Sequence, residues 1–371
     1  MKISKKDALI WFDSFSEMNE NEITTKHEEI IYSVFEQIEA AIEKRNETLM
    51  SEIKNLKTLE NRTFFVGNEK KFSNGCRSCL LGTGLGAIRK TNKCNIECKF
   101  CYNYGQLENI PPIGDEMWEI GGTKFYEKDI ELLLSIQNKP TGISYVYLEP
   151  FMEIEKYYPV IKKFSNAGIH QHLYTNGILA TEETLKELGE AGLDEIRFNL
   201  GASNCSEKVI ENIRIAKKYI KKVGIETPMT PEFYQGFFKK KQAILDTKLD
   251  FVNCAELHLN ENNIGNYHGE NMYISRHGYI SPVWSRELTL KFMKVADDEN
   301  WDLAVHDCSN YTKFARGLNL NKGKWFGASD YACEFSRIPY EIFFPILCDD
   351  NFKFLSEEEL PEGYKPEMLA Y

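Results

Sequence analysis

From about residue 83 onward, short apolar runs alternate with amphipathic segments whose apolar residues recur every three or four positions. Such runs are typical of buried parallel strands, and the segments between them are typical of connecting helices. The pattern therefore predicts an α/β fold, a partial (β/α)6 barrel that resembles a TIM barrel with fewer units. The expected strands are 85–90, 143–148, 170–174, 195–200, 222–227 and 250–259, with helices at 154–167, 182–191, 207–221 and 285–300 and a further strand at 301–306.

The first 70 residues follow a helical pattern instead. Thr25-Lys26-His27-Glu28 has the form of a capping box, and apolar residues recur at helical spacing from Ile30 to Ile53. We expect this apolar stripe to pack on the outside of the main domain or to form a dimer contact. The chain then divides into a helical annex (1–70), a barrel core (71–260) and an α/β C-terminal extension (261–371) that closes the barrel and contributes to the substrate site.

Polar residues alternate with apolar ones along three of the expected strands, which places them on one face of each. Buried charges without partners are costly, so these faces suggest a ligand cavity and not an apolar core. The alternative is that Arg197 and Glu256 form an internal ion pair. The residues that would share the inner face are Tyr145, Tyr147 and Glu149, then Arg197 and Asn199, then Cys254, Glu256, His258 and Asn260.

Composition narrows the class of protein. The 371 residues are 42% hydrophobic and 13% aromatic, enough for a large core, and no stretch approaches the length of a membrane span. Without a recognisable export signal, ten cysteines indicate a reducing cytoplasm where thiolates bind metals. The formal charge of -11 opposes nucleic-acid binding. We expect neither a membrane nor a nucleic acid as a partner.

Three cysteines in the run CNIECKFCYN carry the most specific chemistry. Cys94, Cys98 and Cys101 have C-x3-C-x2-C spacing. Three thiolates can hold three irons of a four-iron four-sulfur (4Fe-4S) cluster and leave the fourth iron open to another ligand. A zinc site is the main alternative, although zinc commonly takes four protein ligands in two short pairs.

The triplet and the residues that follow it resemble the radical S-adenosylmethionine (SAM) superfamily, with a general likeness to its activating-enzyme-type core, over about residues 85–260. Tyr147-Leu148-Glu149-Pro150 stands where the family has a Gly-Gly-Glu-Pro turn that meets the methionine amino group, but both glycines are absent. Thr175-Asn176-Gly177 matches the frequent Thr-Asn-Gly turn, and Asn199 stands where a polar residue contacts the ribose. By this resemblance the SAM-binding residues would be Tyr147, Glu149, Thr175, Asn176, Arg197 and Asn199.

The resemblance implies an enzyme and a mechanism. The cluster would bind SAM at its open iron and split it reductively to a 5′-deoxyadenosyl radical, which takes a hydrogen atom from the substrate. Flavodoxin or ferredoxin would donate the electron. Glu256, His258 and Cys308 are candidate catalytic residues, with Cys308 a candidate hydrogen-atom donor.

Cys76 and Cys79 have the C-x2-C spacing of metal ligands. They could join two of Cys308, Cys333 and Cys348 to hold zinc or an auxiliary iron–sulfur cluster. A buried cysteine without a ligand role is the ordinary alternative.

Three classes of function follow. The first is a radical SAM enzyme acting on a small metabolite or cofactor precursor, and the second is a protein- or peptide-modifying enzyme, including a glycyl-radical activase. The third is a noncatalytic iron–sulfur or zinc protein. The polar stretch 260–271 and the segment Trp284-Ser285-Arg286 could contact a substrate or could be solvated loops.

Overall fold

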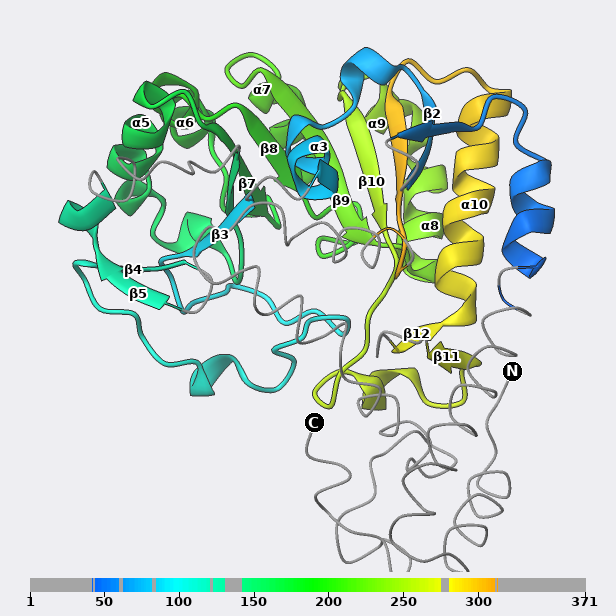
Figure 1. The fold of residues 1–371 in the computed structure, drawn as a ribbon, viewed down its shortest axis with the longest axis horizontal. Coiled ribbons are helices and arrows are strands. Elements are labelled where there is room, and N and C mark those ends of the chain that lie inside the picture. The colour runs from blue at the N-terminus through cyan, green and yellow to red at the C-terminus, as the bar shows by residue number, and fades with distance from the viewer. Residues whose placement is uncertain are drawn as a thin grey trace, which may run out of the picture.

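The computed structural model describes residues 42, 44–59, 63–81, 85–120, 123–130, 142–274, 280–310 and 312. In these residues an 11-stranded sheet forms the centre of the molecule, and seven neighbouring strands of it run parallel (Figure 1). The parallel strands are β3 (Leu85–Arg89), β6 (Gly142–Tyr145), β7 (His170–Thr175), β8 (Glu195–Phe198), β9 (Lys222–Pro228), β10 (Phe251–Ala255) and β13 (Ala304–Cys308).

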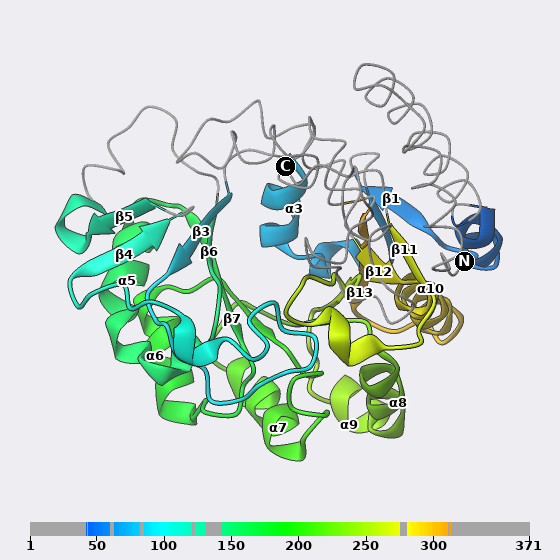
Figure 2. The same ribbon diagram turned by 90° about the horizontal axis from the view of Figure 1, so that it is seen from below.

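The sheet curves into an open arc whose outer side is covered by the connecting helices (Figure 2). Their apolar faces pack with one side of the strands into the main core, which drives the fold because burial of apolar surface is its dominant favourable term. The predicted class, an α/β partial barrel, is confirmed. The helices are α5 (Tyr158–Asn166), α6 (Glu182–Ala191), α7 (Glu207–Ala216), α8 (Pro231–Lys239), α9 (Lys241–Leu245) and α10 (Val283–Asp298).

Both ends of the parallel sheet differ from the expectation of six strands. β13, which belongs to the residues assigned to the extension, pairs in parallel with β10. Beside it runs the antiparallel hairpin of β1 (Lys57–Leu59) and β2 (Thr63–Gly67), from residues assigned to the helical annex. At the other end, β4 (Met117–Ile120) and β5 (Thr123–Tyr126) extend the sheet beside β3.

The inner side of the arc holds α3 (Asn74–Leu81), which lies in the opening of the horseshoe in Figure 2. A smaller apolar cluster joins this helix to β10 and β13 through Phe72, Cys76, Phe251 and Ala304. The inner face of β10 therefore carries Phe251, and the prediction that Cys254 faces inward is wrong, because Cys254 packs in the main core on the helix side.

The prediction of an inward Tyr145 is also wrong. Its ring packs against Tyr157 with centroids 5.7 Å apart, and both residues belong to the main core. β6 ends at Tyr145, so the strand alternation used to place Tyr147 and Glu149 does not continue that far.

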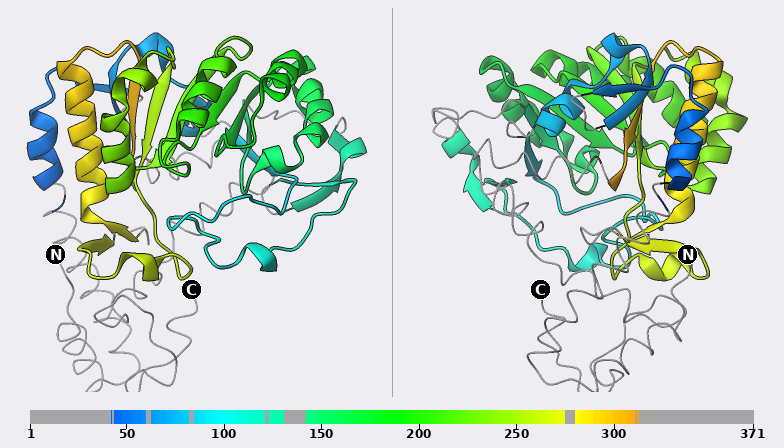
Figure 3. Two further views of the ribbon diagram at one scale, coloured as in Figure 1. Left: turned by 180° about the vertical axis from the view of Figure 1, so that it is seen from behind. Right: turned by 45° about the vertical axis from the view of Figure 1, so that its right-hand side comes forward.

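Residues 44–51 are helical and lie beside α10 (Figure 3). Leu49 and Ile53 join the main core, and Asn55 bonds to Asp297 at 2.9 Å. Packing of the stripe on the outside of the main domain is therefore observed for its last part. The capping box at Thr25 and most of the stripe lie outside the described residues.

The remaining elements are short. None of the helices in the described ranges is long and apolar enough to cross a membrane. The short elements are β11 (Met272–Ile274), β12 (Ile280–Pro282) and 3-10 turns at Glu69–Lys71, Leu107–Asn109, Glu127–Asp129, Pro150–Met152, Ile154–Lys156 and Ile264–Tyr267.

Candidate active site

The cysteine triplet lies in the loop that follows β3, at the carboxyl end of the parallel strands. Cys94, Cys98 and Cys101 are half-buried and form no disulfide. The loop turns tightly around them: the Cys101 amide donates to the Cys98 carbonyl at 2.9 Å, and the Asn103 amide donates to the Cys101 sulfur at 3.4 Å. Amide donors to sulfur are typical of cluster loops, where they help set the potential.

The electrostatics of the three thiols indicate that they lie close together. Burial, and then the neighbouring thiols, raise the pKa of Cys98 to about 12. Burial also raises the pKa of Cys94 and of Cys101. Since burial disfavours the thiolate, a metal must supply compensating positive charge for these residues to act as ligands.

The number of thiols suits a cluster better than zinc. Zinc commonly takes four protein ligands in a structural site, whereas three cysteines can each bind a different iron of a cubane cluster.

A run of asparagines holds the cysteine loop from the opposite side of the barrel mouth. Asn263 is fully buried and donates to the Phe100 carbonyl at 3.1 Å, and Asn262 donates to the Tyr102 carbonyl at 2.7 Å. Asn266 donates to the Lys99 carbonyl at 2.9 Å, and Asn260 also bonds to Tyr102. The polar stretch after β10 therefore positions the loop that carries the cysteines.

Glu149 connects this loop to the end of β7. Its buried carboxylate accepts from the Thr175 hydroxyl and the Asn176 amide, both at 2.7 Å, and from the Phe151 amide at 3.1 Å. Asn176 in turn donates to Asn95, beside Cys94, at 2.7 Å. Burial raises the pKa of Glu149 to about 7 despite these three donors. The structure thus brings three of the predicted cofactor-binding residues together, with the Glu149 side chain used internally.

The turn before Glu149 has the backbone conformation expected of glycine. Tyr147 has φ 68° and Leu148 has φ 57°, the left-handed region that side chains disfavour. The Glu149 amide donates to the Lys93 carbonyl at 3.0 Å, which ties the turn to the residue before Cys94. The turn geometry is therefore present although the glycines are not.

Arg197 and Asn199 lie at different depths. The Arg197 guanidinium is buried and binds Glu195 at 2.6 Å, the Tyr174 hydroxyl and Ser73 at 2.7 Å each, and Glu226. The internal ion pair considered for Arg197 thus exists, but with Glu195 and Glu226 in place of Glu256.

Asn199 lies at the barrel mouth, where its amide donates to the Thr175 carbonyl at 2.7 Å.

Glu256, His258 and Cys308 meet where β10 and β13 end. The Glu256 carboxylate accepts from Tyr273 and from the Asn310 amide at 2.6 Å, and its own amide donates to the Cys308 carbonyl at 3.0 Å. His258 bonds to the Asn310 side chain. Glu256 and His258 therefore belong to one buried polar group at the mouth, and half-buried Cys308 joins it through its backbone carbonyl.

Sequence reasoning missed Tyr273, Asn310, Asn263 and Asn95. The asparagine-rich run was the only signal for Asn263, and it does not distinguish a substrate loop from a clamp. Tyr273 and Asn310 lie 17 and 54 positions from Glu256, so no local pattern connects them.

The second cysteine pair lies on α3, on the inner side of the sheet. Cys76 is buried against Phe65 and Phe72, and burial raises its pKa; Cys79 is half-buried. In the described ranges neither belongs to a group of three ligands around a common point. Cys333 and Cys348 lie outside the described residues, so a metal at Cys76 and Cys79 stays a prediction.

Comparison with protein families finds that residues 88–235 match the model of the Radical SAM superfamily. A Methanocaldococcus jannaschii protein named as a putative glycyl-radical enzyme activating enzyme is 29% identical over 69% of this chain and 69% of its own length. A Pyrococcus furiosus protein named as a tungsten-containing aldehyde ferredoxin oxidoreductase cofactor-modifying protein is 24% identical over 45% of this chain. The chain spans 49% of the Pyrococcus protein, less than two thirds of its length.

Among solved structures, Streptococcus suis SuiB has a TM-score of 0.44 with 14% identity, over 65% of this chain and 53% of its own. The structure of anSMEcpe with bound AdoMet and a peptide has a TM-score of 0.39 with 16% identity, over 76% of this chain and 87% of its own. Both scores lie below 0.5, so neither likeness supports a functional conclusion.

Proposed function

Because the chain belongs to the radical SAM superfamily, as its cysteine spacing predicted, we propose that it cleaves SAM at a 4Fe-4S cluster held by Cys94, Cys98 and Cys101. The cluster would supply one electron and an open iron for SAM, and the resulting 5′-deoxyadenosyl radical would abstract hydrogen from a small metabolite or cofactor precursor. The observation that carries the proposal is the packing of the cysteine loop at the barrel mouth against Glu149 and the asparagine run.

The protein's own residues would place the reactants. The turn at Tyr147 and Leu148 would present backbone groups to the methionine end of SAM, and Asn199 would meet the ribose. Glu149 would hold the turn, Thr175 and Asn176 in register with the cysteine loop through its three hydrogen bonds. Fixed positions of this kind raise the rate by removing the entropy cost of alignment.

The substrate would meet Glu256, His258 and Cys308. Glu256 is 3% exposed and His258 is 9% exposed, so a reacting group must enter the barrel mouth to reach them. This depth supports a small molecule, and the Pyrococcus relative is named as a cofactor-modifying protein. We propose that flavodoxin or ferredoxin donates the electron and that the enzyme works in the reducing cytoplasm.

Cys98→Ala tests the cluster assignment. The variant should form no 5′-deoxyadenosine from SAM with dithionite under anaerobic conditions and should lose the visible absorbance of the reconstituted protein, because each thiolate holds its own iron. The matched control is Cys205→Ala, a buried cysteine of the main core, which should keep both. A Cys98→Ala protein that keeps both would refute the assignment.

A second candidate is protein-directed chemistry, such as activation of a glycyl-radical enzyme. The Methanocaldococcus relative named for this activity matches over more than two thirds of both chains and favours it. The two candidates differ in what stimulates SAM cleavage. A low-molecular-weight fraction of the source cell extract should stimulate repeated turnover if the substrate is a metabolite, whereas stimulation only by the protein fraction would favour the activase.

A further inference from the structure

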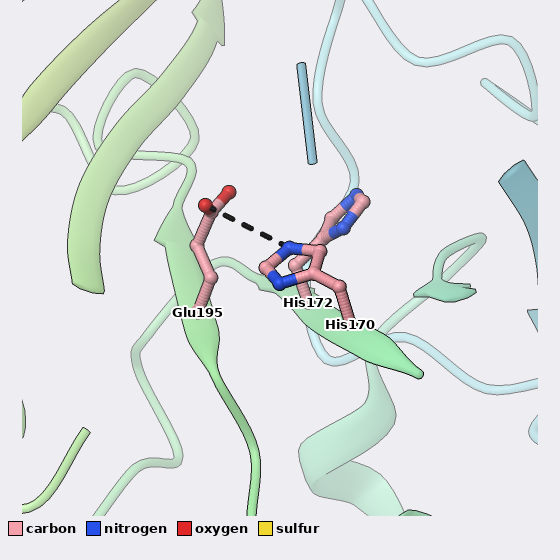
Figure 4. Close-up of side chains that lie close together, drawn as sticks. All are labelled: His170, His172 and Glu195. Atoms are coloured by element: carbon pink, nitrogen blue, oxygen red, sulfur yellow. Dashed lines mark ion pairs between the residues drawn. The ribbon is translucent and has the colours of Figure 1, made fainter. Parts of the chain in front are cut away.

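Three side chains converge on the inner face of the sheet, away from the cysteine loop. His170 and His172 lie two residues apart on β7 and so share a face, and His172 is directly opposite Glu195 on β8. One ligand atom from each lies within 4.8 Å of those of the other two. Figure 4 shows the carboxylate of Glu195 beside the two imidazole rings.

Their polar atoms are buried without hydrogen-bond partners. Both ring nitrogens of His172, the Nε2 of His170 and the Oε2 of Glu195 lack a partner, and His172 and Glu195 are fully buried. Buried polar groups almost always have a hydrogen-bond partner, because a buried group without one loses its hydrogen bonds to water and gains none in the protein. One such atom from each of the three residues lies near a common point, which indicates a missing ligand.

The other atoms of the group are already held in place. Glu195 Oε1 accepts from Ser73 at 2.7 Å and from Arg197 at 2.6 Å, so Oε2 is the oxygen that remains. His170 Nδ1 lies 3.8 Å from an oxygen of Asp194, and its Nε2 lies 4.0 Å from Glu195 Oε2. A carboxylate behind one ring nitrogen leaves the other to bind a metal, a common arrangement around metal-binding histidines.

The ligand set consists of one carboxylate and two imidazoles, and neutral imidazole is the form of histidine that binds metals. The positive charges near the group are Lys222 and Arg197, and the Arg197 guanidinium is shared by Glu195 and Glu226. The two carboxylates balance these two positive charges.

We propose that His170, His172 and Glu195 bind a divalent first-row transition-metal ion, with zinc as the reference ion. Two imidazoles and one carboxylate are an established ligand set for zinc and ferrous iron. Around a tetrahedral zinc with bonds of about 2.0–2.1 Å, two ligand atoms lie about 3.3 Å apart. His170 Nε2 and Glu195 Oε2 are 4.0 Å apart, so they would close by less than about 1 Å around the ion.

The position of this site makes it separate from the cysteine loop. His170 is the first residue of β7, and Thr175, which contacts Glu149 at the mouth, is the last, a separation of about 16 Å along a strand. Gly75 of α3 packs so closely on His172 and Arg197 that a Cβ there would approach both within 2.5 Å. The ion would join β7 to β8 at the amino end of the barrel, beside α3.

Zinc content of the full-length protein tests the site. Protein with a reconstituted cluster is incubated with zinc and desalted, and zinc is measured by mass spectrometry for wild type, His170→Asn and His172→Gln. A parallel set in a Cys94→Ala, Cys98→Ala and Cys101→Ala background excludes zinc on the cluster cysteines. His306→Gln is the matched control, because His306 is another buried inner-face histidine, whose Nε2 is bonded to Thr63.

Wild type and His306→Gln should hold about one zinc per chain in both backgrounds, and the two other variants should lose at least about ten-fold. Zinc should also raise the Tm of wild type and not of His170→Asn, a half-buried position where the substitution is mild. The proposal would be overturned if wild type held no zinc, or if His170→Asn and His172→Gln held as much zinc as wild type. A cobalt-substituted protein whose sulfur-to-cobalt absorption band disappears with Cys76→Ala would also overturn it, since the ion would then lie on cysteine.

Discussion

Tyr147 and Leu148 occupy the left-handed backbone conformation that glycine adopts most readily. Left-handed φ costs a residue with a side chain about 1–2 kcal/mol, and here two successive residues adopt it. The turn keeps this conformation because Glu149 is bonded on both sides, to Lys93 through its amide and to Thr175 and Asn176 through its carboxylate. Strain of this kind is typical of functional sites held by their surroundings.

Glycine should be tolerated at Tyr147 better than alanine. Tyr147→Gly should have a free energy of unfolding about 1 kcal/mol higher than Tyr147→Ala, because only glycine relieves the left-handed strain. Urea unfolding of both variants measures the difference. Leu179, exposed and without positive φ, is the control, and there glycine should be the less stable of the two. If the same one of the two variants, glycine or alanine, were the more stable at both positions, the result would contradict strain at Tyr147.

His306 should make stability depend on pH. Burial lowers its pKa to about 3, so below about pH 6.5 the unfolded chain binds a proton that the folded chain does not. The contribution of His306 to the free energy of unfolding is therefore fully present above pH 6.5. It is lost as the pH drops towards 3, by up to about 1.4 kcal/mol per pH unit. His306→Gln should lose less stability than wild type between pH 6.5 and 5 in urea unfolding. Parallel curves for the two proteins would contradict a neutral buried His306.

At the scale of elements, the asparagine segment after β10 acts as a clamp on the cysteine loop. Four asparagines donate to carbonyls of Lys99, Phe100 and Tyr102, so the loop is held through its backbone. Tyr267 on the same segment lies close enough to Cys98 for the thiol to contribute to its raised pKa, for which burial is the main cause.

Asn263→Asp should weaken the hold on the cluster. The aspartate keeps the shape but removes the amide donor to Phe100, a bond worth about 1 kcal/mol, or about five-fold in the population of the closed loop. Iron and sulfide per chain after anaerobic desalting should fall. Asn109→Asp, an exposed change of equal charge, should keep both at the wild-type level. If Asn263→Asp kept the wild-type amounts of iron and sulfide, the hydrogen bond from Asn263 would not be needed to hold the cluster.

Much of the fold follows from local pattern, whereas the contacts between elements do not. β7, β8 and β9 carry apolar residues such as Leu173, Ile196 and Ile225 on the helix side, and they lie between amphipathic helices, so the local pattern made them evident as strands. The alternation that would put Cys254 on one face with Glu256 stops at Ala255, where β10 ends. Cys254 therefore faces the helices, whereas Glu256 bonds to Asn310 at the mouth.

The candidate site was predictable to the same degree. The cysteine spacing and the Thr175-Asn176-Gly177 turn are local, and they identified the mouth. The His170, His172 and Glu195 group was not evident, because Glu195 lies 23 positions from His172 and only the register of β7 and β8 brings them together.

At the scale of the whole molecule, the two ends of the barrel have different roles. The carboxyl ends of the strands carry the cysteine loop, Glu149 and the Glu256 group, while α3 closes the inner side towards the amino ends (Figure 2). Enzymes of barrel type place chemistry at the first end and stability at the second.

Cys76 and Cys79 therefore should not be needed for SAM cleavage. Replacing both with alanine should leave 5′-deoxyadenosine formation within about two-fold of wild type, since buried Cys76 serves as a small apolar residue of the inner cluster. Thermal unfolding of the same variant reports any cost to packing. Loss of the primary cluster in this double variant would contradict the separation of the two ends.

The most direct test of the proposed activity is electron paramagnetic resonance of the reconstituted, dithionite-reduced protein with and without SAM. Three protein thiolates leave one iron to bind SAM, so the account predicts the signal of a reduced 4Fe-4S cluster whose g values shift when SAM is added. A spectrum unchanged by saturating SAM, or a protein that binds only zinc at Cys94, Cys98 and Cys101, would contradict it.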